Sequence, residues 1–481
     1  MLNTESVERY KLILFAGAFL LTAALLGVVT AQRGFLLVLL MTVTLGGILV
    51  VTGRVSVWMS FLLLVAAGVS LGRLYVEFGP SPLNTRRLQQ LGLLSFVALA
   101  MLPQIARRRD ILPPPSVAWG LIAYIVGTFA SIAMTMDNIH DRSAFAGQLY
   151  AIVFGLITFV AAYHLCRTES DAKQIFTVFL VVAIVQSLLG WFQFFFPDEF
   201  DNLVMPFDWL QYYSTESKYI RRGRAFSIWY HAPAFGGVMA AMVPMNMFWL
   251  LTAKGSWHKV LAAFSLAATL SGVLLSGSVT PTLATGIILG LYLVLSSGKG
   301  RVTMMIWGLI ALALVLLVAP LGTNPSGLSV ESRTVFQRIV NPTYADMGSV
   351  YGRLELYQES TRLWLRNPLW GVGLGQLPFR HGLLIAWTAH SAYFQMLAER
   401  GLIGMLGFLA IISVLFWRNV QAWQNASSRK EAMLMLSLSL VGVTVLLCSV
   451  TDYLWNCWNI QLLFWLSQGA VVRLTYQGDG E

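Results

Sequence analysis

The stretch TAHSAYFQMLAERGLIG, residues 388–404, is the one around which the rest of the chain is organised. It places His390, next to Ser391, on a short polar-faced segment. That segment runs through a charged join at residues 399–401 directly into the apolar run 402–417. The pattern predicts a histidine at a membrane surface, tethered to a membrane helix.

Composition predicts the same class of protein for the whole chain. Hydrophobic residues make up 57% of the sequence and charged residues 11%, whereas soluble domains carry about 25% charged residues. Segments that alternate in polarity over about 10 residues, as in a membrane β-barrel, are missing from the sequence. Three cysteines, Cys166, Cys448 and Cys457, are too few for a disulfide framework. We therefore expect a polytopic helical membrane protein.

Apolar runs long enough, or nearly so, to cross about 30 Å of hydrocarbon recur along the chain. The predicted fold is an all-α, polytopic transmembrane bundle of 12 to 14 spans, with the lower number applying if two early runs form a re-entrant hairpin. The fourteen candidate spans are 12–29, 35–52, 55–71, 91–105, 117–134, 149–165, 175–195, 232–252, 260–275, 280–295, 302–321, 402–417, 432–450 and 457–472.

Lysine and arginine in the short loops predict the orientation, because cytoplasmic loops carry an excess of both. The cluster at residues 107–109 and the basic residues at 254, 259, 299, 301, 418, 429 and 430 share one side if every run crosses. Both termini then lie in the cytoplasm. The predicted parts are N-terminal transmembrane helices 1–195, a periplasmic loop 196–231, central helices 232–321, a large periplasmic loop 322–400 with an amphipathic helix, and C-terminal helices 401–481.

The two outer loops carry ten of the 32 basic residues, against the expected charge bias. Long translocated loops escape that bias, so solvated side chains are one interpretation. The other is a site for a polyanion such as a lipid diphosphate, because guanidinium groups pair bidentately with phosphate oxygens. The residues are Lys218, Arg221, Arg222, Arg224, Arg333, Arg338, Arg353, Arg362, Arg366 and Arg380.

The large outer loop has internal order. Apolar positions recur at helical spacing over 350–365 and predict an amphipathic helix on the membrane surface, ended by Asn367 and Pro368. The following LWGVGLGQLP, residues 369–378, is predicted as a flexible turn rather than a nucleotide-binding loop, because no strand precedes its glycines. The acidic FPDEFD at 196–201 favours a solvated loop over a divalent-metal site.

Three blocks, in order, resemble the O-antigen ligases and the related O-antigen and exopolysaccharide polymerases. HSAYFQMLAERGLIG fits a signature of histidine, then Asn, Ser or Gln, nine residues and Gly-x-x-Gly, filled by His390, Ser391, Gly401 and Gly404. RRGRAFSIWYHAPAFGG, from residue 221, and GRLELYQESTRLWLRNPLWGVGLGQLP, from residue 352, are similar to two other segments of that superfamily. One departure is SGSVTPT at 276–282, where many relatives carry a Ser-Arg pair and this chain has no basic residue.

The resemblance implies an inverting, metal-independent glycosyltransferase without a cofactor. Its donor is a glycan on undecaprenyl diphosphate, and it acts at the periplasmic face of the bacterial inner membrane on an acceptor hydroxyl. Lipid A-core as the acceptor makes the protein a ligase in lipopolysaccharide biosynthesis, and a second lipid-linked glycan makes it a polymerase. The His390 block fits the ligase signature at every fixed position, which favours the ligase.

The same resemblance assigns the site. A histidine, with an unperturbed pKa of about 6.5, is suited to act as the base for the acceptor hydroxyl, which assigns catalysis to His390. Arg224 and Arg353 match the two arginine blocks and are expected to bind the diphosphate, together with Arg221 and Arg222. Further candidates for the pocket are Ser391, Tyr393, Gln395 and Glu399, with His381 as the reserve base.

Alternatives from other classes remain open. A flippase or other transporter has a similar number of spans, but it typically shows repeated halves and ionisable residues within the spans. A structural scaffold gives no reason for the His390 block. A metal-dependent oligosaccharyltransferase requires a chelator-sensitive ion. We expect no nucleic-acid partner, and membrane lipids as surroundings.

Overall fold

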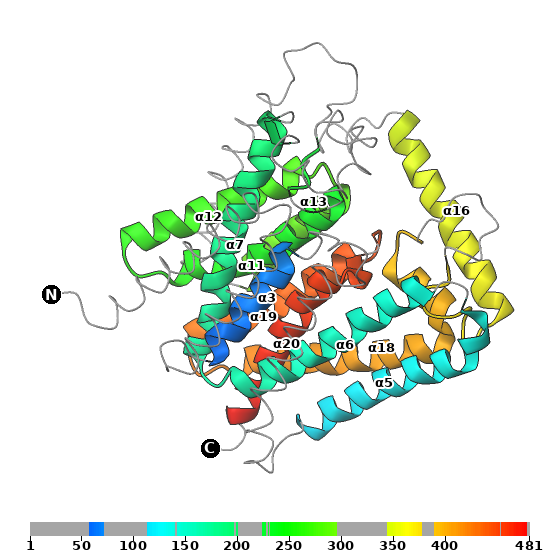
Figure 1. Cartoon of the computed structure of the whole chain (residues 1–481). Helices are drawn as coiled ribbons and strands as arrows, with labels where there is room; N and C mark the ends of the chain where they lie inside the picture. The colour runs from blue at the N-terminus through cyan, green and yellow to red at the C-terminus, as the bar shows by residue number, and fades with distance from the viewer. Residues whose placement is uncertain are drawn as a thin grey trace, which may run out of the picture.

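The computed structural model describes residues 57–71, 113–139, 142–196, 199–200, 224–227, 229, 231–295, 344–377, 389–452 and 454–478. The regular secondary structure in this part of the chain is entirely helical, with no strand (Figure 1). Its elements are α3 (Val57–Leu71), α5 (Pro115–Thr135), η1 (Met136–Asn138), α6 (Arg142–Leu165), α7 (Glu169–Phe195), α11 (Ala232–Thr252), α12 (Ser256–Leu275), α13 (Val279–Leu295), α16 (Tyr344–Arg366), α18 (Ala392–Gln424), α19 (Arg429–Cys448), η3 (Leu454–Asn456) and α20 (Trp458–Gly478).

Ten of the predicted spans coincide with helices, and the runs 12–29, 35–52, 91–105 and 302–321 lie outside the described residues. Within the described chain, seven helices are long and apolar enough to cross a membrane. These are α5, α6, α7, α11, α12, α18 and α19, while α13 is a shorter apolar helix. α20 was predicted as a span but is not among the seven, because its sequence carries several amide and hydroxyl side chains. The architecture fits a helical membrane bundle, and the total of 12 to 14 spans stays a prediction.

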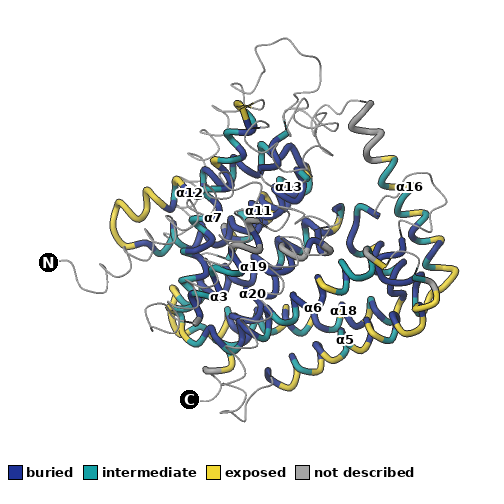
Figure 2. Tube along the Cα trace, in the orientation of Figure 1, coloured by how far each residue is buried: buried dark blue, intermediate teal, exposed yellow. Residues whose placement is uncertain are grey.

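Helix α11 forms the centre of the bundle. It packs against α12, α19 and α13, and almost all of its residues are buried (Figure 2). Small residues in APAFGGVMAA let neighbouring helices approach closely, as is usual where membrane helices meet. Pro244 lies inside the helix, and its carbonyl oxygen accepts a hydrogen bond of 2.9 Å from the Tyr292 hydroxyl on α13. Tyr292 also bonds Ser437 of α19, so this polar group joins three helices.

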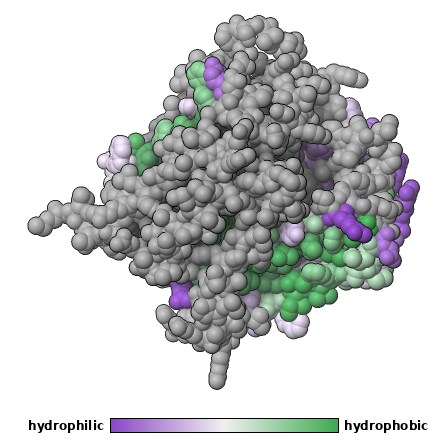
Figure 3. Space-filling model, viewed as in Figure 1, coloured by the Kyte–Doolittle hydropathy of each residue, from purple (hydrophilic) through white to green (hydrophobic). Residues whose placement is uncertain are grey.

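The outer faces of α5, α12 and α18 expose large apolar side chains such as Phe129, Phe264 and Leu406. Figure 3 shows part of this apolar surface at the lower right, over α5. Trp257, near the start of α12, and Trp417, near the end of α18, are 69% and 63% exposed. Both lie at the helix ends that are farther from residue 390. Tryptophan concentrates at membrane–water interfaces, so this end of the bundle has the chemistry of a membrane boundary.

Helix α16 lies across the other end of the bundle, at the right of Figure 1. It ends at Arg366, before Asn367 and Pro368, as the sequence predicts. Ser360 and Leu363 are buried, whereas Leu354 and Leu365 of the predicted apolar stripe are 48% and 62% exposed at the protein surface. The reason is that α16 packs sideways on α18 through a small core of Leu363, Val372, Leu377, Ala389 and Ala398.

The glycine-rich turn after α16 is buried and ordered, so the prediction of a flexible turn was wrong. It crosses α18 where that helix breaks at Gly401, which has φ 63° and ψ −167°. The N–H groups of Val372 and Gly373 donate to the carbonyls of residues 398 and 399 at 2.9 and 3.0 Å. In the other direction, Leu402 N–H donates to Pro368 O at 2.8 Å. The turn therefore binds the backbone groups that the break releases.

Gly401→Ala is expected to destabilise this junction. A Cβ there would lie 2.4 Å from the Leu369 carbonyl carbon, in a left-handed backbone that costs an L-residue roughly 1–2 kcal/mol by itself. We predict that the free energy of unfolding falls by about 2 kcal/mol or more, which would be measured as a lower midpoint of thermal unfolding in detergent. Gly290→Ala is the control, because its Cβ meets nothing within 4 Å. Equal midpoints for the two variants would contradict the close approach of turn and helix.

Candidate functional site

His390 lies immediately before α18 and has a left-handed backbone with φ 49°. Its Nδ1 is 3.7 Å from Oδ1 of Asp452, which follows α19. The His390 side chain is 19% exposed and that of Asp452 3%, so the carboxylate sits behind the imidazole. The separation is within ion-pair range when the imidazole is protonated.

Asp452 was missed in the sequence analysis. It had one available signal: it is the only carboxylate between Glu431 and Asp479. A buried carboxylate beside a histidine orients the ring and stabilises the imidazolium that forms when the histidine accepts a proton. The pair is therefore suited to general-base chemistry.

Arg224 precedes α11 in the chain, and its side chain packs against the tight turn between α12 and α13. Its Nε donates to the Ser276 carbonyl oxygen at 2.9 Å, and Nη2 donates to Ser278 Oγ at 2.9 Å. The turn passes so close to the arginine that a Cβ at Gly277, which has φ 61°, would be 2.8 Å from Arg224 Cγ. This turn has no basic residue of its own, but the guanidinium of Arg224, from the segment before α11, lies against it.

The segment that carries Arg224 is held by α7 and α12. Ala225 N–H donates to Leu275 O, the last carbonyl of α12, at 2.7 Å. Gln193 Oε1 on α7 accepts from both N–H groups of residues 226–227, at 2.7 and 2.8 Å. Gln193 is 1% exposed, so these bonds are shielded from water. They fix the position of the arginine before any ligand arrives.

Two contacts connect this turn and α16 to the His390–Asp452 pair. The hydroxyls of Thr280, at the start of α13, and Thr451, beside Asp452, are hydrogen-bonded. From α16, the Tyr357 hydroxyl donates to the His390 carbonyl oxygen at 3.3 Å. The structure therefore brings the arginine turn, α16, the histidine and the aspartate to one end of the bundle.

Arg353 lies one helical turn before Tyr357 on α16. Burial raises the pKa of Tyr357, the positive charge of Arg353 lowers it, and the negative charge of Asp452 raises it again. Both charges thus act on the same phenol. Arg353 is thus on the helix that contacts His390 through Tyr357, and Arg224 is beside the α12–α13 turn.

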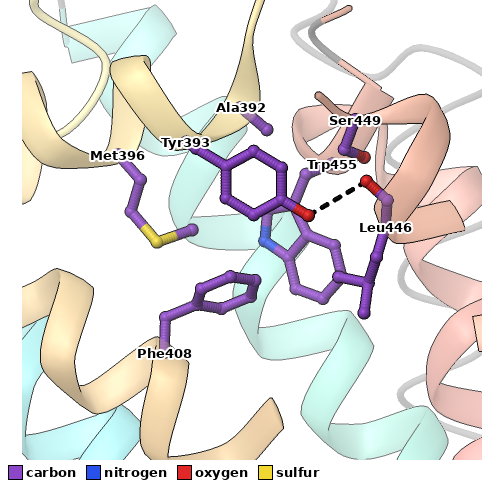
Figure 4. A pocket seen from close by; sticks show the side chains of 7 residues that line it. All are labelled: Ala392, Tyr393, Met396, Phe408, Leu446, Ser449 and Trp455. Atoms are coloured by element: carbon purple, nitrogen blue, oxygen red, sulfur yellow. Dashed lines mark hydrogen bonds between the residues drawn. The ribbon is translucent and has the colours of Figure 1, made fainter. Parts of the chain in front are cut away.

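The predicted pocket residues separate into two groups. Ser391 is buried as the residue that precedes α18, and Tyr393 donates to Leu446 O at 2.9 Å. Tyr393 also lines a small apolar hollow, where its ring converges with those of Phe408 and Trp455 (Figure 4). The partly buried ring thus packs against the core, and a role of Tyr393 in a substrate pocket stays a prediction.

Gln395 and Glu399 form the second group. Both are buried, and Gln395 Nε2 donates to Glu399 Oε1 at 2.7 Å. Glu399 Oε1 also accepts from the Leu377 N–H and from Gln148 Nε2, each at 3.4 Å. Arg221, Arg222 and His381 lie outside the described residues. No group of three His, Cys, Asp or Glu side chains with metal-binding geometry occurs in the part of the chain that the structure describes.

Comparison with known families agrees with the resemblance. Residues 263–409 match the family model described as O-antigen ligase. The matched segment contains the second part of α12, then α13, α16, the glycine-rich turn and the His390 block, whereas Arg224 and Asp452 fall on either side of it. No curated protein matches the chain.

Gln193→Leu is expected to release the segment that holds Arg224. The substitution keeps most of the side-chain volume but leaves two buried N–H groups without their acceptor, which costs roughly 2 kcal/mol or more. We predict a lower thermal midpoint and faster amide exchange over residues 225–229. Ser187→Ala is the control, because it removes one hydrogen bond, of 2.8 Å to Ala268 O, from the same helix. Slow exchange retained in Gln193→Leu would show that other contacts hold the segment.

Proposed function

We propose that this chain, whose residues 263–409 match the O-antigen ligase family, is a membrane glycosyltransferase that moves a glycan from undecaprenyl diphosphate to an acceptor hydroxyl. The observation that carries the proposal is the pairing of His390 with buried Asp452, at the same end of the bundle as Arg224 and Arg353. A base and two cations are the groups that such a transfer needs.

In the proposed reaction, neutral His390 takes the proton of the acceptor hydroxyl. The acceptor oxygen forms a bond to the anomeric carbon as the bond from that carbon to the diphosphate oxygen breaks, and the electron pair leaves with the diphosphate. Attack from the opposite face inverts the anomeric centre without a covalent glycosyl-enzyme. Asp452 stabilises the imidazolium that results.

The leaving diphosphate gains charge in the transition state, and fixed cations lower that barrier. Arg224 is suited to this role because its guanidinium is already oriented by Ser276 and Ser278. We assign the second cation to Arg353, with Arg221 and Arg222 as additional phosphate-binding residues. Since guanidinium groups neutralise the diphosphate, the proposed reaction is metal-independent and needs no cofactor.

The position of these residues suits a lipid-linked donor. His390, Asp452 and Arg224 lie near the ends of helices in a bundle with apolar outer faces, so a polyprenyl chain in the bilayer can present its diphosphate at the surface. Lys254, Lys259, Arg418 and Arg429 lie at the opposite end of the bundle. The excess of basic residues there supports a cytoplasmic location for that end, and hence a periplasmic site in the inner membrane.

We favour lipid A-core as the acceptor, which makes the protein an O-antigen ligase; a second lipid-linked glycan, which makes it a polymerase, is the alternative. Ser391 and His381 remain proposed pocket residues. A lipid-linked oligosaccharide flippase is the lower alternative, and the next experiment distinguishes all three.

Deletion of the gene is expected to change the lipopolysaccharide profile on gels. For a ligase, unsubstituted lipid A-core accumulates beside long undecaprenyl-linked chains, and wild-type complementation restores substituted core. Core that carries a single repeat unit indicates a polymerase, as does a normal lipopolysaccharide profile with loss of another polysaccharide. Undecaprenyl-linked single units that remain on the cytoplasmic side indicate a flippase.

Glycan transfer by the purified protein is expected to continue in the presence of a metal chelator.

His390→Asn and Asp452→Asn test the chemistry. Asparagine tolerates the left-handed backbone at position 390, so the first variant is expected to keep its fold and lose transfer. Asp452→Asn keeps the shape of the side chain but removes its charge, and we expect kcat to fall by about 100-fold or more with little change in KM. Exposed Asp137 provides the control, Asp137→Asn. Near wild-type turnover of the two site variants would exclude the pair as the base.

A further inference from the structure

The backbone of His390 is in a conformation that needs outside support. Its φ of 49° lies in the left-handed region, which costs a residue with a Cβ roughly 1 kcal/mol or more. A loop residue free to relax would leave that conformation, and its imidazole would then leave Asp452. Contacts that hold the adjacent peptide groups therefore control the geometry of the pair.

Three hydrogen bonds from three elements hold the peptide groups around His390. Ala389 N–H donates to Gln395 Oε1 at 3.3 Å, within the first turn of α18. The Tyr357 hydroxyl of α16 donates to the His390 carbonyl oxygen. Ala392 N–H donates to the Ser449 carbonyl at the end of α19, at 3.0 Å. The backbone is thus held before, at and after the histidine.

Glu399 determines which end of the Gln395 amide faces Ala389. Its Oε1 accepts from Gln395 Nε2 at 2.7 Å, so the NH2 group points to the carboxylate and the oxygen to the backbone. The same Oε1 accepts from Leu377 N–H of the glycine-rich turn and from Gln148 Nε2 of α6, each at 3.4 Å. Glu399 is 1% exposed and Gln395 is fully buried, so any effect on the reaction passes through other residues.

We propose that Glu399, Gln395 and Tyr357 are positioning residues that hold the left-handed backbone of His390 and so keep its imidazole against Asp452. The assignment of a catalytic effect rests on the proposed function, whereas the backbone support is a property of the fold alone. It replaces the expectation that Gln395 and Glu399 line the substrate pocket.

The test compares Glu399→Ala with Glu399→Gln in the full-length protein in detergent. The glutamine retains an Oε1 that can accept from Gln395, whereas alanine removes the acceptor. Asn419→Ala is the matched control, because Asn419 is a buried amide that donates to Gln468 at 2.8 Å near the far end of α18. Two measurements are made: hydrogen exchange of the peptide that contains residues 389–392, and kcat and KM for the lipid-linked donor.

Glu399→Ala is expected to speed exchange of that peptide and to lower kcat by about 10-fold or more, with KM within about 2-fold, since a displaced base slows chemistry rather than binding. Glu399→Gln should retain most of both properties, and Asn419→Ala should change neither. If Glu399→Ala does not fold, Tyr357→Phe, which removes one hydroxyl, is expected to show the same pattern with a smaller effect.

Unchanged exchange in Glu399→Ala would overturn the proposed support of the backbone. Faster exchange with a raised KM and normal kcat would overturn the positioning role and return Glu399 to substrate binding. Failure of the function itself is distinguishable, because wild-type protein would then show no transfer while the exchange difference between the variants persisted.

Discussion

The break of α18 at Gly401 is the constraint on which the site depends. A broken helix leaves buried backbone groups that must find partners inside the protein. Here the carbonyls of residues 398 and 399 and the N–H groups of residues 402 and 403 are all bonded to residues 368–373. The turn must lie directly on the helix to reach them, and a Cβ at Gly371 would be 2.5 Å from the Glu399 carbonyl carbon. Gly371 is therefore required by this close contact and by its φ of 76°.

This junction has a second consequence, because the turn is the direct continuation of α16. Once the turn is bound to α18, α16 is held beside the start of the same helix, where Leu363 joins the small core with Ala389 and Ala398. Tyr357 is then next to His390, and the charge of Arg353 acts on Tyr357 from the same helix. Buried Glu399, which accepts from the turn at Leu377, links the same junction to the histidine through Gln395. The contacts that satisfy one helix break thus also place α16 beside the residues that precede α18.

The sequence predicted the helices well and their contacts poorly. Apolar runs gave α11 at its observed bounds, and Asn367 with Pro368 gave the end of α16. Periodicity, however, shows only that a helix has faces, and tertiary packing decides which face is covered. Ser360 can be buried at low cost because its hydroxyl donates to the Leu356 carbonyl within its own helix and so needs no water partner. The pairing of His390 with Asp452 joins positions 62 residues apart, a contact that no local pattern contains.

The same limitation explains the departure at residues 276–282. Judged by sequence, the turn between α12 and α13 has lost a cation, because none of its residues is basic. In the structure the turn closes around Arg224, which approaches from a segment 52 residues earlier and bonds the Ser276 carbonyl. The arginine side chain fits against the turn because residue 277 is a glycine, whose missing Cβ would lie 2.8 Å from Arg224 Cγ. Electrostatics depends on where a charge lies and not on which position of the chain supplies it, so the loss of a basic residue from the turn does not remove the positive charge from this end of the bundle.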